Sequence, residues 1–234
     1  MKLNNLFSNA RPGKVFRIAS IVVLISLAVV WAFARGDSKP DDSAMTTEKA
    51  AMGEGDGMAV FAGGCFWGVE AVFERLEGVV DVMSGYSGGS AETASYYKVG
   101  SGTTGHAESV RILYDSARIN YETLLDVFFS VAHDPTQLNY QGPDVGTEYR
   151  SAIFFADDEQ KQITERFIKE LEKKNTYDKP IVTQVVQLDE FYPAEEYHQD
   201  FMALNPNHPY ILYWDVPKIA HLEKEFPELL AESE

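Results

Sequence analysis

The amino-acid sequence predicts an α+β fold in which helices cover a sheet. Two observations lead to this prediction. Between residues 58 and 188, short apolar runs typical of strands alternate with stretches in which apolar residues recur every three or four positions, as in amphipathic helices. Residues 58–234 are also long enough to form one domain with a sizeable core.

The first part of this domain predicts a strand, a helix and a second strand. Residues 58–61 form a short apolar run that is typical of a strand. A helix is predicted over about 66–76, because the apolar residues there follow helical spacing at Val69, Val72, Phe73 and Leu76. Residues 79–83 predict the next strand.

The central part predicts a strand, a helix and a strand. In Glu108–Tyr114 the side chains alternate, which places one set on a common face: Val110, Ile112 and Tyr114. Asn120 can cap a helix whose apolar side consists of Tyr121, Leu124, Leu125 and Phe128. Residues 150–156 predict a further strand. The order β-α-β-β-α-β is typical of a split β-α-β, ferredoxin-like, two-layer sandwich.

The last part predicts one more helix and strand and then a helical tail. Asp157 can cap a charged helix with one apolar stripe, formed by Ile163, Phe167, Ile168 and Leu171. Residues 181–188 predict a strand. Pro193 and Pro217 are well placed for the first turns of short helices.

The N-terminal segment, residues 1–36, differs from the rest. Basic residues precede Ile18–Ala34, a run of 17 uncharged residues that ends in a small-x-small cleavage pattern, Ala32-Phe33-Ala34. This predicts a signal peptide or a retained signal anchor, and we expect the remainder to be exported to the periplasm or another extracytoplasmic space. If uncleaved, residues 18–34 would anchor it in the inner or plasma membrane. Residues 37–57 predict a flexible acidic tether.

The chain is strongly acidic outside this segment. Residues 1–36 hold five Lys and Arg and no Asp or Glu, which leaves 15 basic against 36 acidic residues and a net charge of −21 in the remainder. Such a charge argues against a nucleic-acid partner. Because there is one cysteine, no internal disulfide can form, and the apolar core must hold the domain together.

That cysteine, Cys65, is the first candidate for chemistry, in the run Ala62-Gly63-Gly64-Cys65-Phe66-Trp67-Gly68. It lies where a predicted strand turns into a helix. The free N–H groups of a helix N-terminus lower the pKa of a thiol and favour the nucleophilic thiolate. The glycines allow another molecule to approach the backbone closely. The alternative is a buried cysteine that acts as a small apolar residue.

Two long polar loops, 84–107 and 133–149, border further candidates. Glu108 shares a strand face with the apolar Val110 and Ile112, where burial raises the pKa of a carboxyl group and makes it a proton donor. Asp144 and Tyr149 lie in the second loop and can offer hydrogen bonds to a ligand. The alternatives are a glutamate bent back to water, a turn aspartate and a packing tyrosine.

The histidines leave a second class of function open. No two of the five have the i, i+4 spacing of a helical metal site, so we expect no metal ligands. A thiol hydrolase that pairs Cys65 with His106 or His133 is a serious alternative, because such a pair needs only spatial proximity. A noncatalytic binding module is the third reading.

One signature and six supporting motifs, in order along the chain, resemble those of the A-type peptide methionine sulfoxide reductases. The run from Gly63 to Gly68 is similar to the active-site signature of that family. The other motifs are Gly85-Tyr86-Ser87-Gly88-Gly89, Tyr96-Tyr97-Lys98-Val99, Gly105-His106-Ala107-Glu108, His133-Asp134-Pro135-Thr136-Gln137, Asp144-Val145-Gly146-Thr147-Glu148-Tyr149-Arg150-Ser151 and Phe191-Tyr192-Pro193-Ala194-Glu195-Glu196-Tyr197-His198-Gln199. The match spans about residues 58–215 and makes 58–234 the expected catalytic domain.

The resemblance implies thiol-dependent reduction of the S epimer of methionine sulfoxide, free or in oxidised proteins, without a metal or organic cofactor. It implies that Cys65 attacks the sulfoxide sulfur and becomes a sulfenic acid, while Glu108 donates a proton to the oxygen. The remaining catalytic positions are Tyr96, Tyr149 and Asp144. The substrate-binding positions are Phe66, Trp67, Gly64 and His106.

The sequence departs from the family pattern in three places. Many members carry further cysteines near the C-terminus that resolve the sulfenic acid, whereas this chain carries none. An external thiol, either a small one or a thioredoxin-like protein, must therefore restore Cys65. Pro143 and Glu148 stand where amides are common, and the N-terminal segment fits repair of exported proteins. We expect a monomer.

Overall fold

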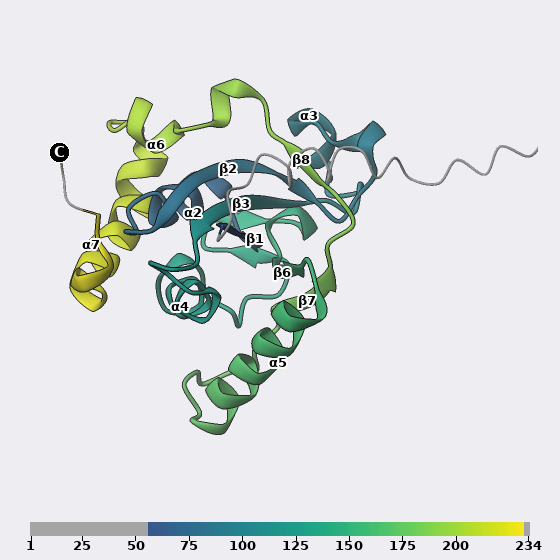
Figure 1. Cartoon of the computed structure of the whole chain (residues 1–234). Helices are drawn as coiled ribbons and strands as arrows, with labels where there is room; N and C mark the ends of the chain where they lie inside the picture. Colours follow the sequence, from purple (N-terminus) through teal and green to yellow (C-terminus); the bar gives the residue numbers. More distant parts are fainter. Residues whose placement is uncertain (1–55, 232–234) are drawn as a thin grey trace, which may run out of the picture. The chain divides into compact units, whose positions relative to one another are not determined.

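The computed structural model describes residues 56–231 (Figure 1). The predicted export segment, residues 1–36, lies outside the described residues, and so does the predicted tether up to residue 55. Asp56 and Gly57, at the end of the predicted tether, begin the first strand. Within residues 56–231, no helix combines the length and the apolar character that crossing a membrane requires.

Six strands form one sheet in the order β7-β6-β1-β3-β2-β8. β3 lies between β1 and β2 and is antiparallel to both, and β6 is antiparallel to β1. β1 and β2 are therefore parallel, with β3 inserted between them, which confirms the predicted split β-α-β unit. The strands are β1 (Asp56–Gly63), β2 (Val79–Ser87), β3 (Ala107–Asp115), β6 (Ser151–Phe155), β7 (Gln184–Gln187) and β8 (Phe191–Pro193).

Two helical connections cover one face of this sheet. α2 (Phe66–Phe73) joins β1 to β2, and α4 (Tyr121–Val127) continues as a π-helix over Phe128–Ala132 before β6. As predicted, Asn120 caps α4, where its Oδ1 accepts a hydrogen bond from the Thr123 N–H at 2.9 Å. α2 ends three residues earlier than predicted, although Leu76 is still 1% exposed and packs into the core.

The main core lies between these helices and the sheet. The ring of Phe61 in β1 packs against three other rings at centroid distances of 5.8, 5.9 and 4.8 Å, those of Phe73, Tyr121 and Phe128. The alternation predicted for β3 is confirmed, because Val110 and Ile112 are fully buried in this core. A smaller cluster covers the opposite face and consists of Val60, Ala62, Ala107, Ala152, Phe154 and Leu188.

The C-terminal part extends the sheet at both edges. α5 (Asp158–Lys173), capped by Asp157 as predicted, leads to β7, which is parallel to β6 and shorter than the predicted strand 181–188. Pro193 ends β8 instead of opening a helix, which the sheet tolerates because β8 is an edge strand that needs no further N–H donor. Pro217 lies in the first turn of α7 (Val216–Glu225), as predicted.

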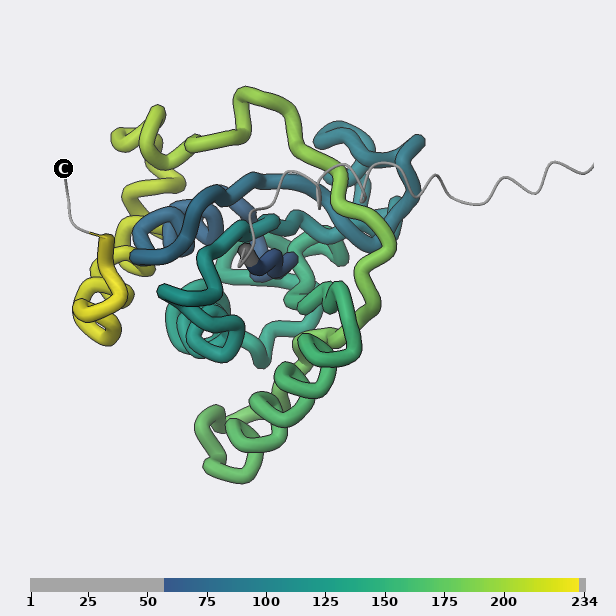
Figure 2. Tube along the Cα trace, viewed as in Figure 1, coloured from purple at the N-terminus to yellow at the C-terminus, as the bar shows by residue number. Residues whose placement is uncertain are grey.

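The two long loops contain short elements. The first holds α3 (Tyr96–Val99). The second holds a hairpin of β4 (Tyr140–Gln141) and β5 (Asp144–Val145), followed by a 3-10 turn. After β8 the chain forms α6 (Phe201–Leu204), a π-helix over Ile211–Asp215 and then α7. Figure 2 shows this C-terminal segment beside α2, although about 140 residues separate them in the sequence.

Candidate active site

Cys65 lies at the junction of β1 and α2, as predicted. Gly64 just before it adopts a left-handed backbone with φ of +93°, which a residue with a side chain rarely adopts. This turn places Cys65 at the N-cap position of α2, with φ of −53° and ψ of 124°. The residue is 9% exposed. A short strand, a glycine turn and a helix thus place the thiol at the surface of the main core.

The ionisation of Cys65 differs from the sequence-based expectation. Burial raises the pKa of the thiol well above its ordinary value, and the charges of Glu108 and Asp215 raise it further. The Trp67 N–H and the Lys218 ammonium act in the opposite direction. The helix N-terminus therefore contributes as predicted but does not decide the outcome, and the prediction of a lowered pKa is wrong for the free enzyme.

Glu108 faces this thiol from β3. It is 3% exposed, and its Oε2 accepts a hydrogen bond from the Phe66 N–H at 3.2 Å. Burial raises the pKa of its carboxyl group to about 8, the charges of Asp144 and Glu148 add to this, and the Phe66 N–H opposes it. The predicted buried orientation is confirmed. At neutral pH the group is protonated and able to donate.

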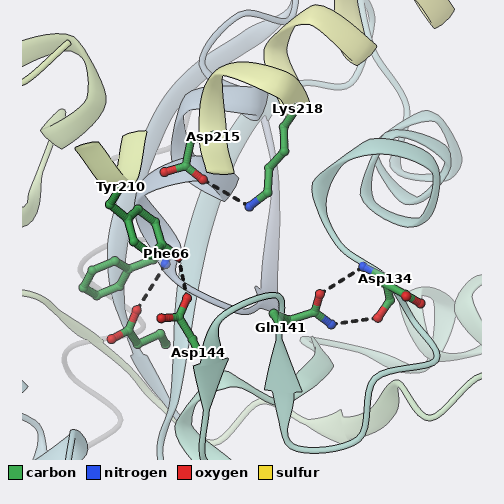
Figure 3. A network of polar contacts seen from close by, with 8 residues as sticks. Phe66, Asp134, Gln141, Asp144, Tyr210, Asp215 and Lys218 are labelled. Atoms are coloured by element: carbon green, nitrogen blue, oxygen red, sulfur yellow. Dashed lines mark hydrogen bonds and ion pairs between the residues drawn. The ribbon is translucent and has the colours of Figure 1, made fainter. Parts of the chain in front are cut away.

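Two tyrosines and an aspartate from the long loops are the remaining predicted catalytic residues near Cys65 and Glu108. Burial raises the pKa of Tyr96 to about 12 and that of Tyr149 further, and the charges of Glu108 and Cys65 raise both. Both hydroxyl groups therefore remain hydrogen-bond donors at neutral pH. Asp144 accepts a hydrogen bond from the hydroxyl group of Tyr210, at the start of the C-terminal π-helix segment (Figure 3). Residues from α3, the hairpin and the C-terminal segment thus surround one thiol.

Trp67 forms a flat, half-buried wall in the first turn of α2. Its ring stacks on Phe201 with a centroid distance of 3.7 Å and an interplanar angle of 8°, and Tyr210 contacts it edge-on at 5.7 Å. Its indole N–H donates to His198 Nδ1 at 3.2 Å. Phe66, in contrast, is 1% exposed and packs between Tyr86 and His198. An apolar group bound at Cys65 would lie beside a fixed aromatic surface.

Gly64 and His106, the other two predicted substrate-binding residues, are both packed against other parts of the protein. A side chain at Gly64 would collide with Gln141, whose Cβ lies 2.6 Å from the position of the added carbon. Gln141 in turn hydrogen-bonds both backbone polar groups of Asp134, at 3.1 and 2.7 Å (Figure 3). His106 is 1% exposed, binds the Ser90 carbonyl through Nε2 at 3.0 Å and packs against tyrosine rings. Their substrate-binding roles stay predictions.

The two histidines proposed for a hydrolase are already engaged. His133 binds the Phe128 carbonyl through Nδ1 at 2.8 Å and the Thr183 hydroxyl group through Nε2 at 3.3 Å. Burial lowers the pKa of His133 to about 4 and also lowers that of His106, so both rings are neutral at pH 7. Among residues 56–231, no group of three or more His, Cys, Asp or Glu side chains could hold a metal ion. The geometry therefore favours the cysteine–glutamate pair over a cysteine–histidine pair.

The comparisons with known proteins agree with this geometry. The model of the peptide methionine sulfoxide reductase family matches residues 57–230. The chain belongs to this family. It is similar to peptide methionine sulfoxide reductase MsrA 2 of Mesorhizobium japonicum, with 56% identity over 185 residues that cover 79% of this chain and 94% of the relative. The corresponding MsrA 2 of Synechocystis is 50% identical over 191 residues, which cover 82% and 89%.

Solved structures support the same conclusion. The crystal structure of Mxr1 from Saccharomyces cerevisiae in reduced form superposes with a TM-score of 0.62 and 34% identity, covering 67% of this chain and 90% of that one. Methionine sulfoxide reductase A of Corynebacterium diphtheriae gives a TM-score of 0.58 and 32% identity, with coverages of 67% and 78%. This chain is thus a peptide methionine sulfoxide reductase with the α+β fold predicted from its sequence.

One departure of this reductase from its family pattern, Glu148, has a structural consequence. Glu148 is 5% exposed, its Oε2 is buried without a hydrogen-bond partner among the described residues, and its charge helps to raise the pKa of Glu108. Contrary to the expectation from the sequence, the glycines around Cys65 do not leave the backbone open to another molecule. Gln141 covers Gly64, and Asp215 and Lys218 cover Gly68. Their absent side chains make room for the protein's own groups.

The C-terminal segment contributes to this reductase site, although its sequence does not predict that contribution. Tyr210, Asp215 and Lys218 lie against α2 and β5, yet no local pattern near Cys65 indicates them. The spacing of Asp215 and Lys218 at i, i+3 was the available signal, because it predicts an ion pair on a helix. It does not predict which part of the domain that pair would cover.

Proposed function

We propose that this reductase acts on the S epimer of methionine sulfoxide, free or in proteins, and that Cys65 is its nucleophile. The observation that carries the proposal is the protonated Glu108, held by the first N–H of the helix that Cys65 begins. A sulfoxide oxygen leaves sulfur only when it receives a proton. A nucleophile and an acid on opposite sides of the S–O bond meet this requirement.

The reaction uses groups that the site supplies. As the Cys65 sulfur bonds to the sulfoxide sulfur, the thiol proton and the Glu108 proton pass to the oxygen, which leaves as water, and the Tyr96 and Tyr149 hydroxyl groups stabilise its developing charge. Water then attacks the Cys65 sulfur, the sulfur–sulfur bond breaks, the thioether departs and one proton returns to Glu108. Cys65 is left as a sulfenic acid, so that one sulfur is reduced and the other oxidised. The substrate methyl group lies against Trp67, where a sulfur–aromatic contact contributes roughly 0.3–1.5 kcal/mol.

Recycling of the enzyme requires an external thiol. Cys65 is the only cysteine, so the sulfenic acid cannot form an internal disulfide. A thiolate from outside attacks the Cys65 sulfur, releases water and forms a mixed disulfide, which a second thiol then reduces. A small thiol or a dithiol protein of the thioredoxin class can do this. Cys65 is 9% exposed, so the external thiol must reach a sulfur that is largely buried.

Residues 1–36 support export of the reductase, with repair of oxidised exported proteins as its role. The basic residues before the apolar run orient such a segment with its N-terminus inside the cytoplasm. A reporter that is active only outside the cytoplasm, fused after residue 60, should be active in cells. Activity of a cytoplasmic reporter at the same position, without any membrane or exported fraction, would contradict export.

The decisive test of the reaction uses stoichiometry. Without reductant, one equivalent of the S epimer should be consumed for each equivalent of enzyme, and the protein should gain the mass of one oxygen. Cys65→Ser should consume none, and the R epimer should remain. Multiple turnovers without a thiol, or hydrolysis of an ester that depends on His106 or His133, would contradict the proposed reaction and favour the hydrolase reading.

A further inference from the structure

An ion pair with a fully buried carboxylate, which the proposed reaction does not use, lies beside the first turn of α2. Asp215 ends the C-terminal π-helix, and Lys218 lies in the first turn of α7. The lysine Nζ is 3.3 Å from the Asp215 Oδ1, and the side chains are 24% and 0% exposed respectively. Figure 3 shows the lysine reaching from α7 toward the side on which Asp144 and Gln141 lie.

The ion pair packs against Gly68, where the absence of a side chain makes room for it. A Cβ atom there would lie 2.6 Å from the Asp215 Cγ and 2.9 Å from the Lys218 Nζ, so both charged groups are in contact with the helix backbone. Gly68 is three residues after Cys65, and residues at this spacing lie on one side of a helix. The ammonium group is therefore fixed on the side of α2 that carries the thiol.

The pair is poorly explained as a device for stability. Apart from the Lys218 ammonium group, neither buried carboxylate oxygen of Asp215 has a hydrogen-bond partner among the described residues. A buried ion pair costs free energy of desolvation that its attraction often does not recover, and here the other hydrogen-bonding positions of the carboxylate are unused. Such an arrangement calls for an explanation in the chemistry next to it.

Six ionisable side chains act on Cys65 or respond to its charge: Glu108, Asp215, Lys218, Tyr96, Tyr149 and Tyr210. Asp215 raises the pKa of the thiol and Lys218 lowers it. Burial raises the pKa of Asp144, and Lys218, like the Tyr210 hydroxyl group, opposes that rise. The lysine thus supplies positive charge to a site that is otherwise lined by acids.

We propose that Lys218 is the counter-ion of the Cys65 thiolate, and that Asp215 anchors its ammonium group beside the first turn of α2. Both are positioning residues, because they act on the substrate only through the thiol. The inference rests on the proposed function in one respect, that Cys65 is the nucleophile, and it adds that the attacking form is the thiolate. It gives the thiolate one cationic neighbour among several acidic groups.

The test measures the ionisation of Cys65 without turnover. The full chain is alkylated with iodoacetamide across a pH series, and the modified fraction is followed by intact mass, which is unambiguous for one cysteine. Lys218→Met should move the midpoint of the profile upward by about one to three pH units, the usual effect of one close charge. Asp215→Asn keeps an oxygen for the ammonium group and removes the negative charge, so its midpoint should move downward.

Matched controls separate charge from folding. Lys224→Met removes an exposed lysine from the same helix and should leave the midpoint at the parent value. Lys218→Arg retains the charge and should stay closer to the parent than Lys218→Met does, with circular dichroism verifying the fold of each variant. A parental midpoint in folded Lys218→Met, or an upward shift in Asp215→Asn, would overturn the counter-ion role. Because alkylation needs no substrate, a shift in an enzyme that fails to reduce the S epimer would refute only the proposed function.

Discussion

Two regions form the site, the N-terminal end of α2 and the C-terminal segment, and only the first can be recognised from a sequence motif. The N-terminal end of α2 carries Cys65 in a glycine-rich turn with Trp67 beside it, a pattern whose chemistry is local. The segment from Phe201 to Lys218 contains no comparable motif, yet it supplies the ring stacked on Trp67 and the ion pair against Gly68. Short motifs identify the groups that react. The groups that surround them come from segments far away in the sequence, which only the folded structure brings close.

The largest effect should come from the motif side of this comparison. Glu108→Gln keeps the shape of the side chain but removes the acid, and we expect the reductive step to slow by about 10²- to 10⁴-fold. In the parent, the pKa of about 8 means that the rate of this step should fall as pH rises through 8, because the carboxyl group then loses its proton.

Single-turnover reduction of the S epimer measures both effects. Glu108→Asp is the control, since it keeps an acid and should retain part of the rate with a similar dependence on pH. A parental single-turnover rate in Glu108→Gln would remove this residue from the mechanism.

The difference between the two regions also accounts for which predictions from the sequence were confirmed and which were wrong. The strand parity of Glu108 follows from local alternation, and the caps Asn120 and Asp157 follow from local hydrogen bonding, so all three could be predicted. The pKa of Cys65 could not, because it depends on burial and on Asp215, 150 residues away. Pro193 was misplaced for a related reason, since an edge strand tolerates proline and the sequence does not show where the edge is.

A smaller effect is expected where the two regions meet through Asp144. Tyr210→Phe removes the hydroxyl group that donates to this carboxylate and links the β4–β5 hairpin to the C-terminal segment. Hydrogen bonds to charged groups are worth about 1.5–3 kcal/mol, and partial exposure reduces this, so we expect kcat/KM to fall about tenfold. Steady-state kinetics with dithiothreitol measures it.

Tyr213→Phe is the matched control for Tyr210→Phe. Tyr213 belongs to the same segment but is 70% exposed, and its loss of a hydroxyl group should leave kcat/KM at the parent value. Equal values for the two variants would mean that the bond to Asp144 does not contribute to the reaction.

Gly68→Ala should act mainly on stability. Replacing a helical glycine by alanine usually stabilises by about 0.5–1 kcal/mol, but here the added carbon would overlap Asp215. Overpacking of this kind costs about 1–3 kcal/mol, so we expect a net loss in the free energy of unfolding. Urea denaturation of Gly68→Ala, of Asp215→Ala and of the double variant measures the coupling between the two sites. If the two losses simply add, the overlap is not the cause.

The smallest effect on the reaction should come from Glu70, a buried glutamate in α2. Glu70 is 1% exposed, and burial, with the charge of Glu74, raises its pKa to about 8, the value given for Glu108. It lies in the middle of the helix, away from Cys65, so Glu70→Gln should leave single-turnover reduction near the parent rate. The pair of glutamates tests whether a raised pKa or its position beside a nucleophile makes a carboxyl group catalytic.

Stability should nevertheless reveal the titration of Glu70. Its pKa is raised in the folded state, so the folded form holds the proton more tightly, and stability falls as pH rises from the ordinary value of 4.5 through about 8. Glu70→Gln removes this dependence and should therefore be more stable relative to the parent at pH 8 than at pH 5. Urea midpoints at the two pH values measure the difference. A Glu70→Gln variant that lost the reductive step as Glu108→Gln does, while gaining no stability at pH 8, would mean that Glu70 takes part in the reaction.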